Sequence, residues 1–438
     1  MDLNRRQFLA TTPLVAVAPA LIRPSRQAAS LSSAAPDWTR LRDELTRDRD
    51  LAYFNWGTYG PPARSVSDVE NSDREAMRKN YNVHFGGHFP APAIRPLIDE
   101  VTRFLGAHVD EFAFATGATE AMNFIASGLD LKEGDEILTT EHEHQAGIYP
   151  YLLQAKRRGI VVRQVPMPAK VTDPQQIVDL FSTAIWPKTR VISFCHIQYT
   201  DGLKLPAKEL CELARRRGVL SVVDGAQAVG MCDVSIRDIG CDLYAASLHK
   251  WLGAPYGTGF LTVRRDLLDH FWPTVIEGYD GWDTVDRYGK PATGPAIDFG
   301  ADWPKALLKL SVNFRYDASA FWAVPEAIRR HEHIGHQAIE ARIRTHVARF
   351  RDGVARIPGV EIVTPESPDL SGGLVSIRKA GADTRAISFN LSRQDRVVMR
   401  YVKHAALNFD VLRASLHAFN TEDEVDRMVA ALDRRLRA

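Results

Sequence analysis

One lysine, Lys250, stands where an apolar segment gives way to a glycine-rich turn. Residues 241–246 before it read as a short strand, and residues 253–259 after it contain glycines that let the backbone approach a ligand closely. Burial of an ammonium group is costly and lowers its pKa, which makes a neutral amine available to attack a carbonyl. A solvated lysine in a surface turn is the alternative, so the rest of the chain must supply the partners of a covalently bound cofactor.

Two further segments could supply those partners. Thr116-Gly117-Ala118-Thr119 lies between a predicted strand and a predicted helix, and the free N–H groups at such a helix start bind anions such as phosphate. Asp224 ends an apolar strand with a carboxylate, which suits a ring nitrogen that must stay protonated. Each feature alone also fits the simple capping of a helix. Together with Lys250 they predict a site for pyridoxal 5'-phosphate.

With these motifs the chain resembles the class V aminotransferase-fold enzymes, the group that contains cysteine desulfurases and isopenicillin N epimerase-like proteins. The resemblance runs from about residue 50 to the C-terminus. Its most specific motifs are Asp224-Gly225-Ala226-Gln227, Ser247-Leu248-His249-Lys250, and Leu412-Arg413-Ala414-Ser415 with Phe419-Asn420-Thr421. It implies fold type I of the pyridoxal phosphate enzymes, an α/β fold with a smaller C-terminal domain. It also implies a homodimer, because the sites of this family lie near the subunit interface.

The resemblance gives the motif residues their roles. Lys250 would bind the cofactor as a Schiff base and move protons, Asp224 would pair with the pyridine nitrogen, and Gln227 would donate to the phenolic oxygen. His144 matches the position that stacks on the ring and completes the expected catalytic set with Lys250 and Asp224. The phosphate would be contacted by Ala118, Thr119, Ser247 and His249. Arg413 would grip the substrate carboxylate bidentately, with a surface ion pair as the alternative.

Three positions depart from the family pattern. Cysteine desulfurases carry a nucleophilic cysteine a few residues after the arginine that matches Arg400, and Ala405 stands there instead. We therefore expect that the chain is not a cysteine desulfurase. Tyr199 stands where the family has an asparagine near the ring. Ser319-Ala320 replaces the Gly-Thr that usually contacts the phosphate across the dimer, which leaves that contact open.

Metal chemistry is not expected. Glu141-His142-Glu143-His144 alternates along the end of a strand without further ligands, and Gly335 stands where an HExxH motif would need its second histidine. The histidines at 331, 333 and 336 read as solvated helix residues. The cysteines show no CxxC or zinc spacing, and Cys195, in an apolar strand, is expected to be a buried free thiol.

The elements that position these residues alternate between strand and helix over residues 94–268. Strands are expected at residues 112–115, 136–139, 161–165, 191–196, 219–224, 243–247 and 259–263. This alternation predicts a mainly parallel sheet with helices on both faces and the ligand at the C-terminal ends of its strands. A long helical region at 319–356, interrupted near Gly335, then leads into a smaller α+β domain.

Four parts of the chain follow from these patterns. We expect an export signal and linker at residues 1–36 and, at 37–60, an N-terminal segment that packs on the small domain. The large cofactor-binding domain is expected at residues 61–304, and the small C-terminal domain at residues 305–438.

The first residues predict export. Arg5-Arg6 precedes a moderately apolar run at residues 8–22, and an Ala/Ser-rich stretch follows, which is the order of parts in a twin-arginine signal. A flexible basic N-terminus is the alternative. The prediction is a periplasmic protein that uses the twin-arginine export machinery. The formal net charge of +1 argues against a nucleic-acid partner, and no apolar run is long enough for stable insertion into a membrane.

The expected function is chemistry at the α-carbon of an amino acid or of an amino-acid-containing natural product. Exported members of the family resemble periplasmic enzymes that tailor peptide siderophores, which gives the most specific expectation. Transamination, epimerisation, C–S lysis and oxidative side-chain modification all fit the motifs. The rival from another class is a catalytically silent binding protein, and the intact set of motif residues argues against it.

Overall fold

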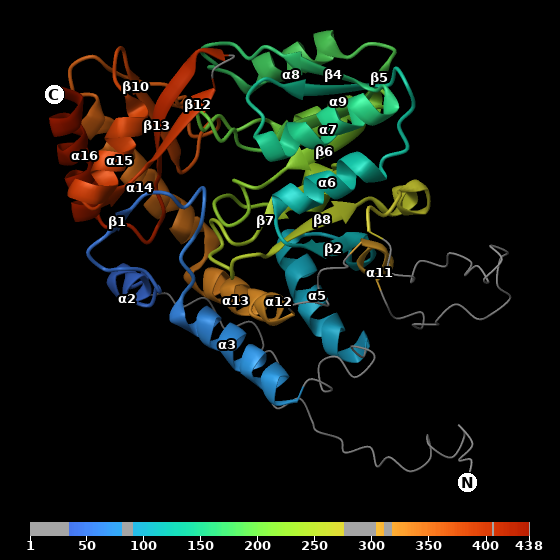
Figure 1. Cartoon of the computed structure of the whole chain (residues 1–438), viewed down its shortest axis with the longest axis horizontal. Coiled ribbons are helices and arrows are strands. Elements are labelled where there is room, and N and C mark those ends of the chain that lie inside the picture. The colour runs from blue at the N-terminus through green and yellow to red at the C-terminus, as the bar shows by residue number, and fades with distance from the viewer. Residues whose placement is uncertain (1–34, 81–90, 276–303, 311–317, 405–406, 438) are drawn as a thin grey trace, which may run out of the picture. The chain divides into compact units, whose positions relative to one another are not determined.

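The largest sheet has seven strands in the order β2-β8-β7-β6-β5-β3-β4 (Figure 1). The strands are β2 (Phe112–Ala115), β3 (Glu136–Thr140), β4 (Val161–Val165), β5 (Thr189–Cys195), β6 (Leu220–Asp224), β7 (Leu243–Ser247) and β8 (Gly259–Val263). The five strands from β4 to β7 run parallel, and β8 is antiparallel to β7 and β2. The expected mainly parallel sheet is confirmed in this computed structural model, which describes residues 35–80, 91–275, 304–310, 318–404 and 407–437.

Both faces of this sheet are buried, because successive residues of a strand point to opposite sides. In β7, Leu243 and Ala245 belong to one apolar cluster, whereas Tyr244 and Ala246 belong to the other. The first cluster is completed by α6 (Ala118–Gly128), α7 (Gln145–Arg158) and α11 (Lys305–Leu310). The second includes residues of α3 (Arg64–Lys79), α5 (Ala91–Leu105), α8 (Pro174–Ala184), α9 (Ala207–Arg216), α10 (Ile236–Ile239) and α13 (Val324–Ile334).

The C-terminal part is built on a four-stranded antiparallel sheet in the order β12-β13-β10-β9. Its strands are β9 (Val360–Ile362), β10 (Leu374–Lys379), β12 (Arg400–His404) and β13 (Phe409–Ser415). The expected long helical region consists of α12 (Ser319–Trp322), α13 and α14 (His336–Val354), since Gly335 adopts a φ of +89° that ends α13. Two more helices, α15 (Thr384–Gln394) and α16 (Glu422–Arg437), complete the expected α+β domain.

The N-terminal segment is joined to this C-terminal part, and Figure 1 shows blue β1 close to the orange and red elements. After α2 (Trp38–Asp43), β1 (Ala52–Tyr53) pairs in parallel with β11 (Val397–Val398). Glu424 of α16 accepts hydrogen bonds from Arg42 at 2.9 Å and Arg47 at 2.6 Å. The four domain boundaries given above stay predictions, and the proposed signal lies almost wholly outside the described residues.

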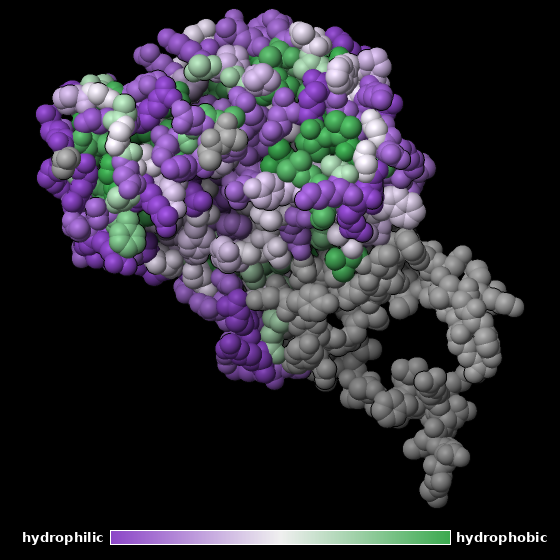
Figure 2. Space-filling model, turned by 45° about the horizontal axis from the view of Figure 1, so that its top comes forward, coloured by the Kyte–Doolittle hydropathy of each residue, from purple (hydrophilic) through white to green (hydrophobic). Residues whose placement is uncertain are grey.

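The surface and the cysteines agree with ordinary globular packing. Figure 2 shows a mainly hydrophilic face on which hydrophobic side chains gather in patches. All four cysteines are free thiols, and Cys195 is buried as expected. Within the described ranges, no helix combines the length and apolar character that crossing a bilayer requires.

Candidate active site

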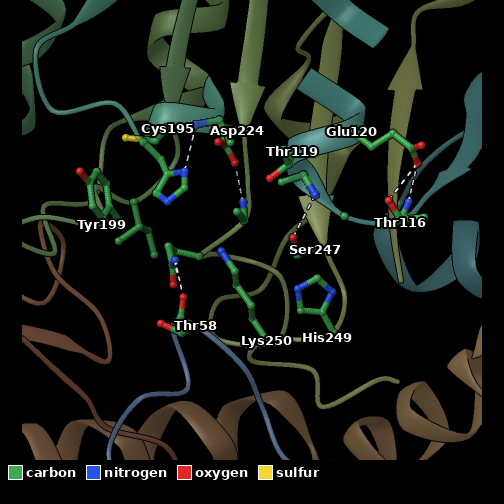
Figure 3. Close-up of a pocket in the computed structure, with 18 of the residues that line it drawn as sticks. Thr58, Thr116, Thr119, Glu120, Cys195, Tyr199, Asp224, Ser247, His249 and Lys250 are labelled. Carbon is green, nitrogen blue, oxygen red and sulfur yellow. Dashed lines mark hydrogen bonds between the residues drawn. The ribbon is translucent and has the colours of Figure 1, made fainter. Parts of the chain in front are cut away.

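A cavity of about 420 Å³ opens at the C-terminal ends of β6 and β7 (Figure 3). It brings together every residue that the sequence predicted for the site: Ala118, Thr119, His144, Asp224, Gln227, Ser247, His249, Lys250 and Arg413. The cavity also contains residues that were not predicted for it, among them Gly57, Thr58, Cys195, Tyr256 and Arg400. The described structure therefore collects the predicted set in one place, although the role of each residue stays a prediction.

Lys250 lies in the turn between β7 and β8. The N–H of Gly60 donates to the carbonyl oxygen of His249 at 2.8 Å, so the N-terminal segment lies directly against this turn. A Cβ atom at Gly60 would lie 1.9 Å from the carbonyl oxygen of Lys250, and only glycine can fit there. The pKa of Lys250 is lowered to about 8, mainly by desolvation and also by Arg413 and Arg400, while Asp224 opposes the shift. A substantial share of the amine is thus neutral near pH 8.

Asp224 ends β6 beneath the cavity and is 5% exposed. One carboxylate oxygen accepts the N–H of Ala226 at 2.9 Å. Desolvation raises the pKa of Asp224, and Lys250 is the nearby cation that opposes this shift. A cationic ring nitrogen placed against this carboxylate would favour its ionised form.

Gln227 is held in one amide orientation. Its Nε2 donates to the carbonyl oxygen of Gly57 at 2.9 Å, and its Oε1 accepts the indole N–H of Trp251 at 2.9 Å. Because an indole N–H can only donate, the oxygen of the amide must face Trp251. The second hydrogen of Nε2 is left to donate into the cavity, as the expected contact to a phenolic oxygen requires.

The start of α6 has the geometry expected of an anion site. Gly117 is the N-cap with no side-chain cap, and Ser247 Oγ accepts the N–H of Ala118 at 2.9 Å. A Cβ atom at Gly117 would lie 3.1 Å from Cε1 of His249 and 3.3 Å from Oγ of Ser247, so the glycine keeps this space open. The alternative of simple side-chain capping is not found at α6, because its N-cap has no side-chain cap hydrogen bond, and Thr116 donates its N–H to Glu120 at 2.7 Å.

His249 is oriented by a backbone carbonyl. Its Nδ1 lies 3.0 Å from the carbonyl oxygen of Thr258, so Nδ1 carries the hydrogen and Nε2 is left for a ligand. Desolvation lowers the pKa of His249 to about 4. A phosphate group beside the ring would raise this pKa, because an anion stabilises the imidazolium.

Arg413 is a buried cation with unused donors. Its Nη1 donates to the carbonyl oxygen of Tyr199 at 2.8 Å, whereas Nε and Nη2 have no partner in the described structure. The residue is 1% exposed, and desolvation lowers its pKa to about 9, with Arg400 adding to the shift. Because an unpaired buried cation is costly, this geometry favours an anion-binding role over the alternative of a surface ion pair.

His144, the N-cap of α7, also lines the cavity. Its Nδ1 accepts the N–H of Ala146 at 3.1 Å, which places the hydrogen of the neutral ring on Nε2. The pKa of His144 is lowered to about 4, mainly by desolvation and also by Lys250, Arg400 and Arg413. The ring meets Tyr199 edge to face at 4.9 Å. His144 is therefore neutral at pH 7 and available as a flat face for a ring.

The alternating Glu/His segment makes no metal site. Glu141 accepts the N–H of Met167, His142 contacts Thr200, and Glu143 accepts the hydroxyl of Thr140 at 2.6 Å, so the side chains diverge. No group of metal-ligating side chains occurs among the residues the structure describes.

Two other predictions concern residues outside the cavity. His331 is buried and lies 3.2 Å from the carbonyl oxygen of Gly230, so its description as a solvated residue is wrong. Ser319 and Ala320 are buried in α12, and a cross-dimer phosphate contact there stays untested.

These residues fit a phosphorylated pyridine cofactor. The cavity offers an open anion site at α6, a buried carboxylate, an amide donor and a lysine amine of lowered pKa. The sequence missed the contributions of Gly57, Gly60 and Trp251. No local motif marks them, since each acts through a residue far away in the chain.

Comparison with known proteins agrees with this site. The family model described as aminotransferase class-V matches residues 75–299 and 312–428. An isopenicillin N epimerase from Streptomyces clavuligerus is 33% identical over 401 residues, which is 91% of this chain and 98% of that protein. A probable cysteine desulfurase 2 from Mycobacterium leprae is 32% identical over 426 residues, or 93% and 96% of the two chains.

Solved structures share the fold. The apo structure of a cysteine desulfurase from Thermococcus onnurineus has a TM-score of 0.76 at 23% identity, covering 92% of this chain and 99% of that one. A mutant of the protein C-DES, with glycine covalently linked to its PLP cofactor, has a TM-score of 0.76 at 23% identity and covers 91% and 99%.

The expectation that the chain is not a cysteine desulfurase is wrong, because proteins described as such are among its relatives along nearly the whole length. It depended on one residue, Ala405, which lies outside the described residues. One sequence position does not outweigh a similarity that extends along nearly the whole chain. The family match and the extent of these similarities establish that the chain belongs to the class V aminotransferase family of pyridoxal-phosphate-dependent enzymes.

Proposed function

We propose that the chain uses pyridoxal phosphate to break a bond at the α-carbon of an amino acid or of an amino-acid-containing natural product. One observation carries the proposal: Arg413, buried and with two unpaired nitrogens, lines the same cavity as Lys250. A carboxylate bound by Arg413 would leave the rest of an amino acid within a space that also contains the reactive amine.

Some residues of the cavity would bind the cofactor, and Lys250 would transfer protons. When bound, the cofactor accepts the electrons of the bond that breaks. Ala118, Thr119, Ser247 and His249 would hold its phosphate, Asp224 its ring nitrogen and Gln227 its phenolic oxygen. Lys250, with a pKa of about 8, would take a proton from the α-carbon and return it, as general base and then general acid.

Proton removal from the α-carbon is the proposed common step. The isopenicillin N epimerase similarity favours return of the proton, and the cysteine desulfurase similarity favours release of sulfur as the second candidate. In D₂O, the holoenzyme should exchange the α-hydrogen of a substrate amino acid, as seen by proton NMR. Epimerisation adds a change in optical rotation, and sulfur release adds sulfide formed from cysteine.

Transamination has its own signature. An amino donor should convert the bound cofactor to its amine form and change the visible spectrum in step with keto-acid formation. If none of a panel of amino acids changes the spectrum or loses its α-hydrogen, the proposed function is wrong, and the catalytically silent binding protein becomes the better description.

We also propose that Arg5-Arg6 directs twin-arginine export to the periplasm, where a peptide siderophore is the specific substrate candidate. Fractionation of cells should find the protein in the periplasm, and an Arg5→Lys, Arg6→Lys variant should remain in the cytoplasm.

A homodimer is the proposed assembly. The hydrophobic side chains exposed on α7, including Tyr149 (57%) and Leu153 (48%), support a contact surface there. Light scattering of the purified protein measures its mass directly.

A further inference from the structure

A second arginine stands beside Arg413 and has no anion to bind within the described structure. Arg400 and Arg413 are direct partners in the antiparallel pairing of β12 with β13. Side chains of directly opposed residues lie on the same face of a sheet, and like charges in that position are destabilising. Both residues line the cavity, and neither forms an ion pair in the part of the chain that the structure describes.

The surroundings of Arg400 place its charge on the substrate side of the cavity. It lowers the pKa values of Arg413, Lys250 and His144, three groups that belong to different elements. At the anion site at the start of α6 the titratable residue is His249, whose pKa is lowered by desolvation and by Lys250 but not by Arg400. A phosphate at α6 therefore leaves the charge of Arg400 without a counter-ion.

The two arginines differ in access. Arg413 is buried, whereas Arg400, its partner across the strand pair, is exposed at the start of β12 and also lines the cavity. One carboxylate on Arg413 satisfies the buried cation and leaves the exposed one unused. We propose that Arg400 binds a second anionic group of the substrate, so that the enzyme selects amino acids with an acidic side chain or a distal carboxylate. This inference rests on the proposed function and specifies its substrate class.

The test compares amino acids that differ only in the distal group. L-glutamate with L-glutamine, and L-2-aminoadipate with L-norleucine, are titrated into the holoenzyme while the visible spectrum of the cofactor is followed. The wild-type protein should bind each diacid about fivefold more tightly than its neutral counterpart, a modest ratio because water screens a partly exposed arginine. Arg400→Gln should abolish this ratio, because the larger loss of affinity falls on the diacids.

A matched control lies on the same strand. Lys403 carries the same charge on the opposite face of β12, where it pairs with Asp410 at 3.6 Å. Lys403→Gln should keep the preference for diacids, and Arg400→Lys should retain part of it. Arg400→Gln should also raise the melting temperature of the ligand-free protein, because it relieves the repulsion from Arg413.

Two results overturn the inference alone: equal binding of acidic and neutral amino acids by the wild-type protein, or an equal loss for both in Arg400→Gln. A spectrum that responds to none of the four amino acids overturns the inference together with the proposed function. The two failures are thus distinguishable in one set of titrations.

Discussion

The two sides of the cavity differ in how far their polar groups are already bonded. On the side of the large sheet, Ser247 accepts the N–H of Ala118, and Gln227 is fixed between Gly57 and Trp251. On the side of the C-terminal sheet, Arg413 has two nitrogens without partners in the described structure. The first side is preorganised for one constant ligand, whereas the second carries a free-energy cost that a substrate anion would relieve.

Removal of Lys250 should have the largest effect, because it eliminates the group that both sides are arranged around. Lys250→Ala should lower kcat by about 1000-fold or more, in line with the loss of a general base. Borohydride reduction followed by mass spectrometry should find no cofactor covalently attached. Lys188→Ala, at an exposed lysine, serves as the control and should retain both attachment and activity. Full activity of Lys250→Ala would refute its assigned role.

On the side of the C-terminal sheet, replacing Arg413 should lower activity and raise stability. Arg413→Met should lower kcat/KM by about 100-fold, since charge-assisted hydrogen bonds contribute about 1.5–3 kcal/mol. The same change should raise the free energy of unfolding of the ligand-free protein by about 1 kcal/mol, because a buried unpaired cation is removed.

Arg351 provides the contrasting variant. It is partly buried, and its guanidinium donates to the carbonyl oxygens of Thr364 and Pro365 at 3.2 and 3.3 Å. Arg351→Met should therefore lower the free energy of unfolding, as chemical denaturation can show. If both variants lower the free energy of unfolding equally, the two unpaired nitrogens of Arg413 do not destabilise the ligand-free protein, and the proposed difference between the two sides of the cavity is wrong.

Cofactor binding on the large-sheet side of the cavity should weaken when Trp251, which does not itself line the cavity, is changed. Trp251→Phe removes the hydrogen bond that orients Gln227 and should weaken cofactor binding about fivefold, for a loss of roughly 1 kcal/mol. In a Gln227→Ala background the same change should have little further effect, which a double-mutant cycle measures. Additive losses would show that Trp251 acts through packing and not through the amide.

The smallest expected effect is a shift in pH dependence that links the two sides. Only the neutral amine of Lys250 reacts with an aldehyde, so the rate of cofactor attachment to the apoenzyme should rise with pH and level off above about 8. Arg413 lowers the pKa of Lys250, and Arg413→Met should therefore move the midpoint to higher pH. Stopped-flow absorbance gives both profiles, and an unchanged midpoint would argue against coupling across the cavity.

Local patterns in the sequence were sufficient for most of the fold. Apolar segments bounded by turns located the strands of the large sheet to within a few residues, and a glycine at 335 located the break between α13 and α14. The residues that face a cofactor were also predictable, because they sit in short motifs such as Ser247-Leu248-His249-Lys250. What these motifs share is that the reactive side chain and its neighbours are adjacent in the chain.

Contacts between distant segments were beyond the reach of the sequence. Gly60 is required only because the carbonyl of Lys250 lies beside it, and Trp251 orients Gln227 through a bond that no spacing rule reveals. The exclusion of cysteine desulfurases was wrong because it depended on the single position 405 and not on the similarity along the rest of the chain. The burial of His331 was likewise invisible before its helix had been placed against Gly230.

The pairing of β1 with β11 has a consequence for the order of events during synthesis. The partners of residues 52–53 lie at residues 397–398, in the C-terminal part of the fold. Gly57 and Gly60 can therefore take their places only after residues 397–398 have been synthesised, and such distant pairings form slowly. The part of the cavity lining that Gly57 provides is then completed late in folding, so cofactor binding should report that these two distant segments have paired.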